Sequence, residues 1–392
     1  MACGGRRILP EPRAAGPAAR GCPARPTLID SLAQWFRKPA GGFSLERLAR
    51  EAPGLAAAFL WSENRLPPLP GGAPWLHLGC GDHVLEGFVN LDFLPHDARV
   101  SPWDLLDPWP ERWPVPAAGA FSEDTLEHFF LAEQLYILCE MNRLLGEGRV
   151  MRVLMPSFSR LVDYCRGFRP DPAEFLHGTF AVETQADAVN AGLRFSGHRW
   201  LHDDASLAHL AALAGFEAVK TSCAESTEPF LAGRNLRAEE GTAAFAHDLV
   251  KRRALERVVV PSWELSGIDV VERLPGGAAL GRVCGTGASV DWRLPAPVAV
   301  RAIACVNARG ANLSSFREHS LKRLRFAGPG GEGAWPLDET LKSRACMNLA
   351  TPAAVRLALG GRTDQVSSVR LEPGAAGDLV TLGPLEVFYF PG

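Results

Sequence analysis

The chain has 392 residues, of which 47% are hydrophobic and 22% charged, the balance of a globular protein with a sizeable core. Its length predicts two domains and a tail, and its formal net charge is −3. Residues 71–230 hold 11 basic and 23 acidic residues, a charge of −12. This acidity disfavours a nucleic-acid substrate and suits a cationic ligand, although it could equally be a solvated surface.

The sequence lacks the features of membrane and secreted proteins. No apolar run reaches the length of about 18 residues that crosses a bilayer, and the first residues lack the apolar core of a secretory signal. The nine cysteines are scattered, form no CxxC pair and are odd in number, which favours reduced thiols and no metal centre. We therefore expect a cytoplasmic protein without a transmembrane segment.

The N-terminal part is predicted to precede the main domain. Residues 1–26 are rich in Ala, Pro, Arg and Gly without periodicity, which predicts a disordered tail. In residues 27–70, apolar side chains recur at helical spacing as far as Phe59 and predict two short helices. The run Leu66–Gly72 contains three prolines and two glycines, which predicts a linker.

Residues 71–250 alternate between strand and helix patterns. This alternation predicts an α/β domain with a mostly parallel sheet covered on both faces, as in a Rossmann-like fold. The expected strands are Trp75–Leu78, Phe88–Asp92, Ala118–Phe121, Val150–Met155 and Glu217–Thr221, and the expected helices are Leu126–Leu145 and one from Asp203-Asp204 to Leu213.

Residues 258–392 have a different sequence pattern, without the alternation of strands and helices. Short β-prone runs are separated in several places by Gly/Pro-rich turns, a pattern typical of an antiparallel β-sandwich or jelly roll. The expected strands are Arg257–Val260, Val298–Ala304, Arg323–Phe326, Val355–Leu359, Val369–Leu371 and Leu385–Phe390.

The first predicted strand of the α/β domain ends in Gly79-Cys80-Gly81, and the next ends in Asp92. Closely spaced glycines let the backbone approach a ligand, and an acidic residue after the next strand can accept hydrogen bonds from a ribose diol. Asp92 follows Gly79 by 13 residues, whereas a dinucleotide fingerprint requires GxGxxG and an acid about 20 residues on. The spacing therefore disfavours nicotinamide and flavin cofactors.

The ordered motifs LHLGCG, GFVNLDF, WDLLDPWP, AFSEDTLEHF, MNRLLGEGRVMRVLMPS and GHRW…LAHLAALAGFEAV occupy residues 75–220. In this order they resemble class I S-adenosylmethionine-dependent methyltransferases, most closely a subgroup associated with polysaccharide and cell-surface biosynthesis. The sequence departs from that family in the short, glycine-poor passage from Asp82 to Gly87, which puts the path of the methionine loop in doubt.

The resemblance implies S-adenosylmethionine as cofactor and assigns roles by position. The implied contacts are Gly79, Cys80 and Gly81 for the methionine moiety, Asp92 for the ribose, Asp104 and Leu105 for the adenine, and Ser122, Glu123 and Asp124 for the region of the transferred methyl, with Leu126, Glu127 and His128 supporting that loop.

Each acidic or basic candidate also has a structural interpretation. Glu123, Asp124 and Glu127 stand where a helix begins, so they could stabilise its positive end instead of taking part in catalysis. His128 could be a partly buried structural histidine. His198 ends a segment, from about residue 171, that we expect to cover the substrate pocket, and it could stabilise a turn. As a hypothesis, His128 or His198 is the catalytic base for an acceptor hydroxyl or amine, because histidine titrates near neutral pH.

The leading hypothesis is a methyltransferase acting on a sugar, glycan precursor or related small acceptor. The alternatives are a non-catalytic glycan-binding or scaffold protein with a degenerate methyltransferase fold, and an enzyme that uses a nucleotide sugar or nicotinamide. The C-terminal region weakly resembles galactose-binding-like modules. Trp292, Trp335 or Phe316 could form a sugar platform there, or could simply belong to the core.

Overall fold

A computed structural model describes residues 67–264, apart from 70, 94–96, 107–108, 111–112, 166–183, 191–196 and 236–243. Beyond residue 264 it describes 268–274, 277, 279–283, 290–299, 303–310, 321–328, 331–336, 355–358, 365–373 and 379–391. The predictions for residues 1–66 lie outside the described residues. Within the described residues, no helix has both the length and the apolar character needed to cross a membrane.

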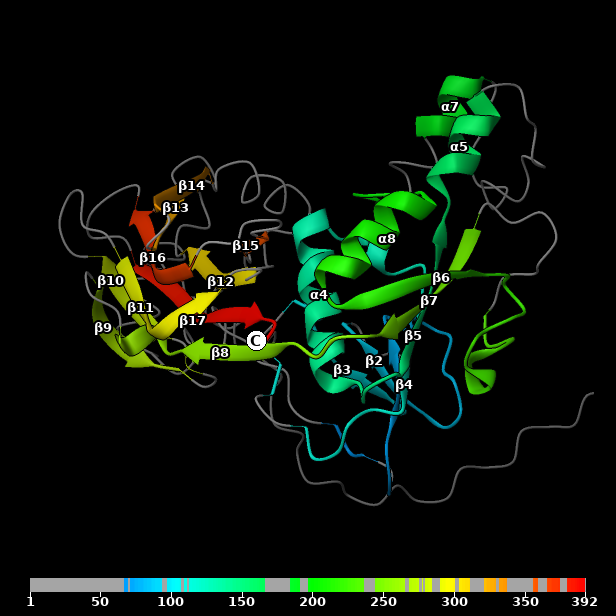
Figure 1. The fold of residues 1–392 in the computed structure, drawn as a ribbon, viewed down its shortest axis with the longest axis horizontal. Helices are drawn as coiled ribbons and strands as arrows, with labels where there is room; N and C mark the ends of the chain where they lie inside the picture. Colours follow the sequence, from blue (N-terminus) through cyan, green and yellow to red (C-terminus); the bar gives the residue numbers. More distant parts are fainter. Residues whose placement is uncertain are drawn as a thin grey trace, which may run out of the picture. The chain divides into compact units, whose positions relative to one another are not determined.

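A seven-stranded sheet forms the centre of the α/β region, in the order β3-β2-β1-β4-β5-β7-β6 (Figure 1). Strands β1 to β5 pair in parallel, and β7 is antiparallel to both β5 and β6. The mostly parallel α/β sheet is therefore confirmed. The strand bounds are β1 Trp75–Leu78, β2 Phe88–Asp92, β3 Val100–Pro102, β4 Gly119–Glu123, β5 Val150–Pro156, β6 Phe216–Thr221 and β7 Ala244–Lys251.

Alternating side chains of the strands bury against two different layers. Leu76 and Leu78 of β1 belong to the larger apolar cluster, together with the helices, and Trp75 packs on the opposite side. On that opposite side, the ring of Phe230 stacks on Trp75 with the ring centroids 4.3 Å apart. Because both faces are covered, the central strands are almost entirely apolar and buried.

Two helices cover the face that carries Leu76 and Leu78. They are α4 (Leu131–Leu144) and α8 (Asp204–Leu213), which lie beside each other along the strands (Figure 1). Asp203 caps α8 as predicted, accepting a hydrogen bond of 2.7 Å from the Ser206 N–H. Two further helices, α5 (Phe158–Cys165) and α7 (Gln185–Asn190), follow β5 in the chain.

The single helix predicted from Leu126 to Leu145 is divided in the structure. A 3₁₀ turn, η1 (Leu126–His128), comes first, and α4 begins at Leu131. Leu126 is 1% exposed and Glu127 is fully buried, so tertiary burial fixes the turn in place. This break places His128 at the end of the 3₁₀ turn and outside α4.

The sequence interpretation missed β3 and β7. β7 carries His247 and Asp248 in its middle, and these polar residues conceal its strand pattern. Both are buried, and Asp248 forms an ion pair of 3.0 Å with Arg152 of β5, in which neither side chain is exposed. A cross-strand ion pair therefore replaces the apolar contact that periodicity would have revealed.

The described strands from β8 onward pair antiparallel in two sheets. One has the order β15-β12-β17-β10-β9 with β8 also paired to β17, and the other has the order β11-β16-β13-β14. A β-sandwich also needs the two sheets to pack face to face, so this finer prediction and the boundary at residue 258 stay predictions. The bounds are β8 Glu256–Val260, β9 Ile268–Arg273, β10 Ala279–Val283, β11 Val290–Ala299, β12 Ile303–Gly310, β13 Leu321–Gly328, β14 Gly331–Pro336, β15 Val355–Ala358, β16 Gln365–Pro373 and β17 Leu379–Tyr389.

Trp292 and Trp335 lie on β11 and β14, but the description does not extend to their side chains, and Phe316 lies outside the described residues. The predicted sugar platform therefore stays a prediction.

Candidate functional site

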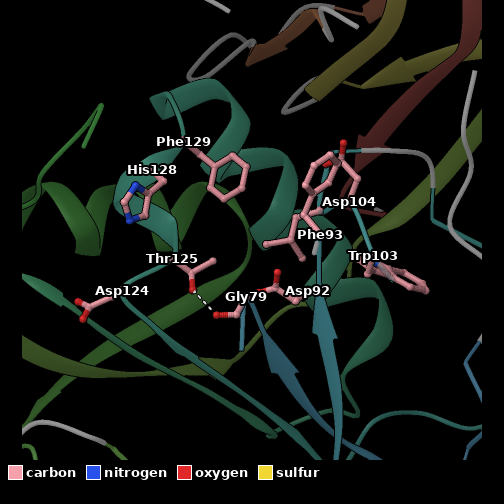
Figure 2. Close-up of a pocket in the computed structure, with 10 residues that line it drawn as sticks. Gly79, Asp92, Phe93, Trp103, Asp104, Asp124, Thr125, His128 and Phe129 are labelled. Atoms are coloured by element: carbon pink, nitrogen blue, oxygen red, sulfur yellow. Dashed lines mark hydrogen bonds between the residues drawn. The ribbon is translucent and has the colours of Figure 1, made fainter. Parts of the chain in front are cut away.

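A cavity of about 390 Å³ lies at the carboxyl edge of the parallel strands. This is the size range of small-molecule sites, and the place is the switch point between β1 and β4 where doubly wound sheets bind ligands. Figure 2 shows Asp124, Thr125 and His128 on one side and Phe93, Trp103 and Asp104 on the other. The lining residues are Gly79, Asp92, Phe93, Trp103, Asp104, Leu105, Asp124, Thr125, His128 and Phe129.

Gly79 begins the turn after β1 and leaves no room for a side chain. Its φ is +60°, and a Cβ built there would lie 2.4 Å from Thr125 Cγ2 and 2.5 Å from Thr125 Oγ1. The Thr125 hydroxyl lies 3.3 Å from the Gly79 carbonyl and 2.9 Å from the Glu123 carbonyl, in hydrogen-bonding geometry with both. The loops after β1 and β4 are thus held at van der Waals distance, and only glycine fits at position 79.

Asp92 ends β2 and reaches the glycine loop. Its Oδ2 accepts a hydrogen bond of 2.8 Å from the Gly81 N–H, and the Leu91 carbonyl accepts one of 3.2 Å from the Cys80 N–H. Residues 79–87, all of them described, contain turns and no helix. A dinucleotide site uses the N-terminus of a helix at this point to hold the pyrophosphate, so its principal anion-binding element is missing.

Trp103, Asp104 and Leu105 form the opposite wall. The Trp103 N–H donates to the Asp92 carbonyl at 2.8 Å, which fixes the distance between the ends of β2 and β3. The Asp104 carboxylate accepts a hydrogen bond of 2.9 Å from the Leu106 N–H and so holds its own turn. Phe93, 56% exposed, adds an aromatic face to this side of the cavity.

Asp124 occupies a strained backbone position at the cavity. Its φ is +50°, and among the described non-glycine residues it is alone in adopting a positive φ. Such strain costs about 1–2 kcal/mol and is concentrated at functional sites. Glu123, the predicted contact one residue earlier, is buried at the end of β4 and is not among the residues that line the cavity.

Cys80 and Gly81 support the cavity without lining it. The Cys80 thiol is 4% exposed, and burial together with the neighbouring Asp92 carboxylate raises its pKa to about 12. It is therefore a neutral thiol at pH 7, and its part in the loop is structural.

The two predicted catalytic histidines lie together, although they are 70 residues apart in the chain. Their ring centroids are 5.1 Å apart, and His128 lines the cavity. Burial and the neighbouring His198 lower the pKa of His128, so its imidazole is neutral at pH 7. Glu127 is fully buried beside them, with its Oε1 3.9 Å from His198 Nε2.

The structure thus brings together around one cavity six predicted residues, which are Gly79, Asp92, Asp104, Leu105, Asp124 and His128. Sequence reasoning missed Phe93, Trp103, Thr125 and Phe129. Phe93 and Thr125 directly follow the predicted Asp92 and Asp124. Their position next to a predicted site residue is the one sequence feature that could have identified them. The role of Thr125 depends on a contact across two strands that no local pattern reveals.

No family model and no curated protein matches the chain. Solved structures that it resembles include an O-methyltransferase family protein from Burkholderia thailandensis, with 18% identity, coverage of 40% of this chain and 36% of that one, and a TM-score of 0.23. Another is the magnesium protoporphyrin IX methyltransferase of Synechocystis PCC 6803 with bound S-adenosylhomocysteine, with 11% identity, coverage of 56% and 94%, and a TM-score of 0.26.

A third neighbour is a family 35 carbohydrate-binding module from Clostridium thermocellum, with 12% identity, coverage of 34% and 97%, and a TM-score of 0.22. The chain spans about a third of the length of the Burkholderia protein. Because these TM-scores are below 0.5, the functional argument rests on the geometry of the site.

Proposed function

We propose that the chain binds S-adenosylmethionine in the cavity between β1 and β4 and transfers its methyl group to a hydroxyl of a small acceptor. The observation that carries this proposal is the Gly79–Thr125 contact with Asp92 alongside. It makes a side-chain-free surface next to a carboxylate that can hold a ribose diol. Three carboxylates line the cavity, those of Asp92, Asp104 and Asp124, and they favour a cationic sulfonium over a phosphate.

In this proposal each wall has its own task. Gly79 and Asp92 hold the methionine and ribose parts, with Cys80 and Gly81 keeping the loop in place, and Asp104 and Leu105 contact the adenine beside Phe93. Glu123 supports the strained turn that presents Asp124 near the methyl group. The finer proposal is an acceptor that is a sugar or glycan precursor, for which the antiparallel C-terminal sheets would supply a binding surface.

For methyl transfer the protein mainly has to position the acceptor hydroxyl against the methyl group of the donor. The acceptor oxygen forms a bond to the methyl carbon while the carbon–sulfur bond breaks, and the electron pair stays on sulfur. The hydroxyl proton must leave, and we assign that part of the reaction to His128 and His198. His128 is on the cavity wall and neutral at pH 7, which fits this assignment.

Two alternatives predict different behaviour. A nicotinamide enzyme would need a pyrophosphate cradle, and the helix-free turn from Gly79 to Gly87 does not provide one. A non-catalytic glycan-binding protein would bind oligosaccharides without turning over a methyl donor.

Titration calorimetry with S-adenosylhomocysteine tests the proposal. We expect wild type to bind and Asp92→Ala to bind about 100-fold more weakly, since two charge-assisted hydrogen bonds of about 1.5 kcal/mol each are lost. Asp92→Asn, which can still accept from the Gly81 N–H, should lose less. Asp97→Asn, outside the cavity, is the matched control. A folded wild-type protein that binds NAD⁺ or neither ligand would overturn the proposal.

A further inference from the structure

Three side chains next to the cavity are held together by backbone hydrogen bonds between distant segments. Glu127 and His128 belong to η1, and His198 belongs to the segment 197–200. The Glu127 carbonyl accepts hydrogen bonds from the Arg199 N–H at 2.7 Å and the Trp200 N–H at 3.2 Å. The His128 ring lies beside the Gly197 backbone, with its Nδ1 3.7 Å from a Cβ built on Gly197. The segment is thereby fixed on η1, so the juxtaposition of the three side chains is built into the fold.

The donor atoms of the three side chains are close enough to converge on one ion. One ligand atom from each of the three side chains lies within 4.8 Å of the other two, and His198 Nε2 is 3.9 Å from Glu127 Oε1. Nitrogen and oxygen ligands lie about 2.0–2.2 Å from Zn²⁺, so two ligands in tetrahedral coordination are about 3.3–3.6 Å apart. Side-chain movements of about 1 Å or less would bring all three atoms to this spacing.

The chemistry of the set is also that of a metal site. Two imidazoles and one carboxylate are ligands that divalent transition metals accept, with coordination positions left for water or substrate. The Glu127 carboxylate is fully buried, and a divalent cation offsets the cost of burying a negative charge.

We propose that Glu127, His128 and His198 bind one divalent transition-metal ion at the wall of the cavity. The sequence alone predicted no metal, because the third ligand stands 70 residues away from the first two. Binding of the ion does not depend on the proposed function, but its use does. With the ion bound, His128 and His198 are ligands of the ion and no longer take up the acceptor proton themselves. The cation then lowers the pKa of the acceptor hydroxyl, so that its proton passes to water.

The test is a titration of the full chain, freed of metal with a chelator, with Co²⁺ and with Zn²⁺. We expect one ion per chain, measured by calorimetry and by the visible absorption of protein-bound Co²⁺. The His198→Ala variant should bind Co²⁺ at least 10-fold more weakly. The His209→Ala variant, which removes an exposed histidine on α8, should bind Co²⁺ as wild type does. Equal binding by the two variants, or no stoichiometric binding by wild type, would overturn the proposal.

A second variant and a second readout protect the test from misfolding. Glu127→Gln keeps the shape of the side chain and removes its charge, so it should also weaken Co²⁺ binding. Thermal unfolding of wild type should shift upward with Zn²⁺, and the shift should shrink in His198→Ala. If Glu127→Gln does not fold, the comparison of His198→Ala with His209→Ala still decides the matter.

The same samples separate this proposal from the function on which its use depends. S-adenosylhomocysteine binding measured without metal tests the cofactor pocket, and Co²⁺ binding measured without cofactor tests the metal site. Metal binding without cofactor binding would support the metal site and overturn the methyltransferase proposal. Cofactor binding without metal binding would support the methyltransferase proposal and overturn the metal site.

Discussion

At the scale of single residues, the candidate site depends on two glycines whose constraints differ. Gly79 has a positive φ and no space for a methyl group against Thr125, whereas Gly81 has a φ of +49° with nothing within 4 Å of a Cβ. The motif therefore contains one position limited by both conformation and contact, and one limited by conformation alone.

This difference predicts unequal effects of the same substitution. Gly81→Ala should lower the free energy of unfolding by about 1–2 kcal/mol, through the left-handed backbone alone. Gly79→Ala should lower it by about 2–4 kcal/mol, because a clash with Thr125 is added, and it should also weaken S-adenosylhomocysteine binding more. Urea denaturation of the two variants measures the first effect, and equal losses would contradict the assigned contact.

At the scale of secondary-structure elements, a buried ionic cluster joins α4, β8 and β17. Arg257 of β8 donates at 2.7 Å both to Glu140 of α4 and to Glu386 of β17, and all three side chains are at most 5% exposed. Tyr136 adds a hydrogen bond of 3.2 Å to Glu386. Burial opposes the charged form of Arg257, but the two carboxylates outweigh it and raise its pKa.

Removing the cation should leave two carboxylates buried without their shared partner. Arg257→Met is expected to cost about 3–5 kcal/mol of unfolding free energy, and the double variant Arg257→Met/Glu386→Leu should recover part of this loss. Arg252→Met breaks an exposed ion pair of 2.7 Å with Glu217 and should cost under about 1 kcal/mol. Urea denaturation compares them, and similar losses for Arg257→Met and Arg252→Met would refute a structural role for the cluster.

At the scale of the whole molecule, the strand order decides where chemistry can occur. The order β3-β2-β1-β4-β5 places a switch point between β1 and β4, and the antiparallel β7 between β5 and β6 departs from the dinucleotide-binding order. The fold also buries histidines that do not line the cavity. His77 on β1 forms a hydrogen bond of 3.1 Å with Asn90, and His202, just before α8, forms one of 2.7 Å with Gln134 of α4.

These two histidines predict acid sensitivity of the fold. Burial is the main cause that lowers the pKa of each from 6.5 to about 4; for His77, His83 lowers it further while Asn90 and Asp92 oppose the shift. In the unfolded chain the two imidazoles are therefore protonated below about pH 6.5, whereas in the native state they stay neutral down to about pH 4. Stability is full above pH 6.5 and falls as the pH drops, by about 3 kcal/mol for each histidine.

Chemical denaturation between pH 7 and 4 checks this expectation. His77→Phe removes one titrating group from an aromatic environment and should reduce the loss of stability between pH 7 and 4 by about 3 kcal/mol, even if it changes the stability at pH 7. His209→Ala, which is exposed, should keep the wild-type slope. An unchanged slope in His77→Phe would show that other groups dominate the acid response.

The sequence by itself determined the elements whose signals are local. The apolar run of β1, the glycines after it and Asp92 at the end of β2 are neighbours in the chain, so their pattern predicted both the strands and the cavity edge. Asp203 before α8 is local in the same way, because a capping side chain bonds to the backbone three residues later.

The tertiary structure alone decided the features that need contacts between distant residues. It inserted β7 into the sheet through the Arg152–Asp248 pair, placed Thr125 against Gly79, and brought His198 to Glu127 and His128. Local periodicity cannot encode these, because each depends on two segments whose separation in space is set by the sheet order. The edge of the cavity can therefore be predicted from the chain, whereas the proposed metal site on its wall depends on contacts that form only on folding.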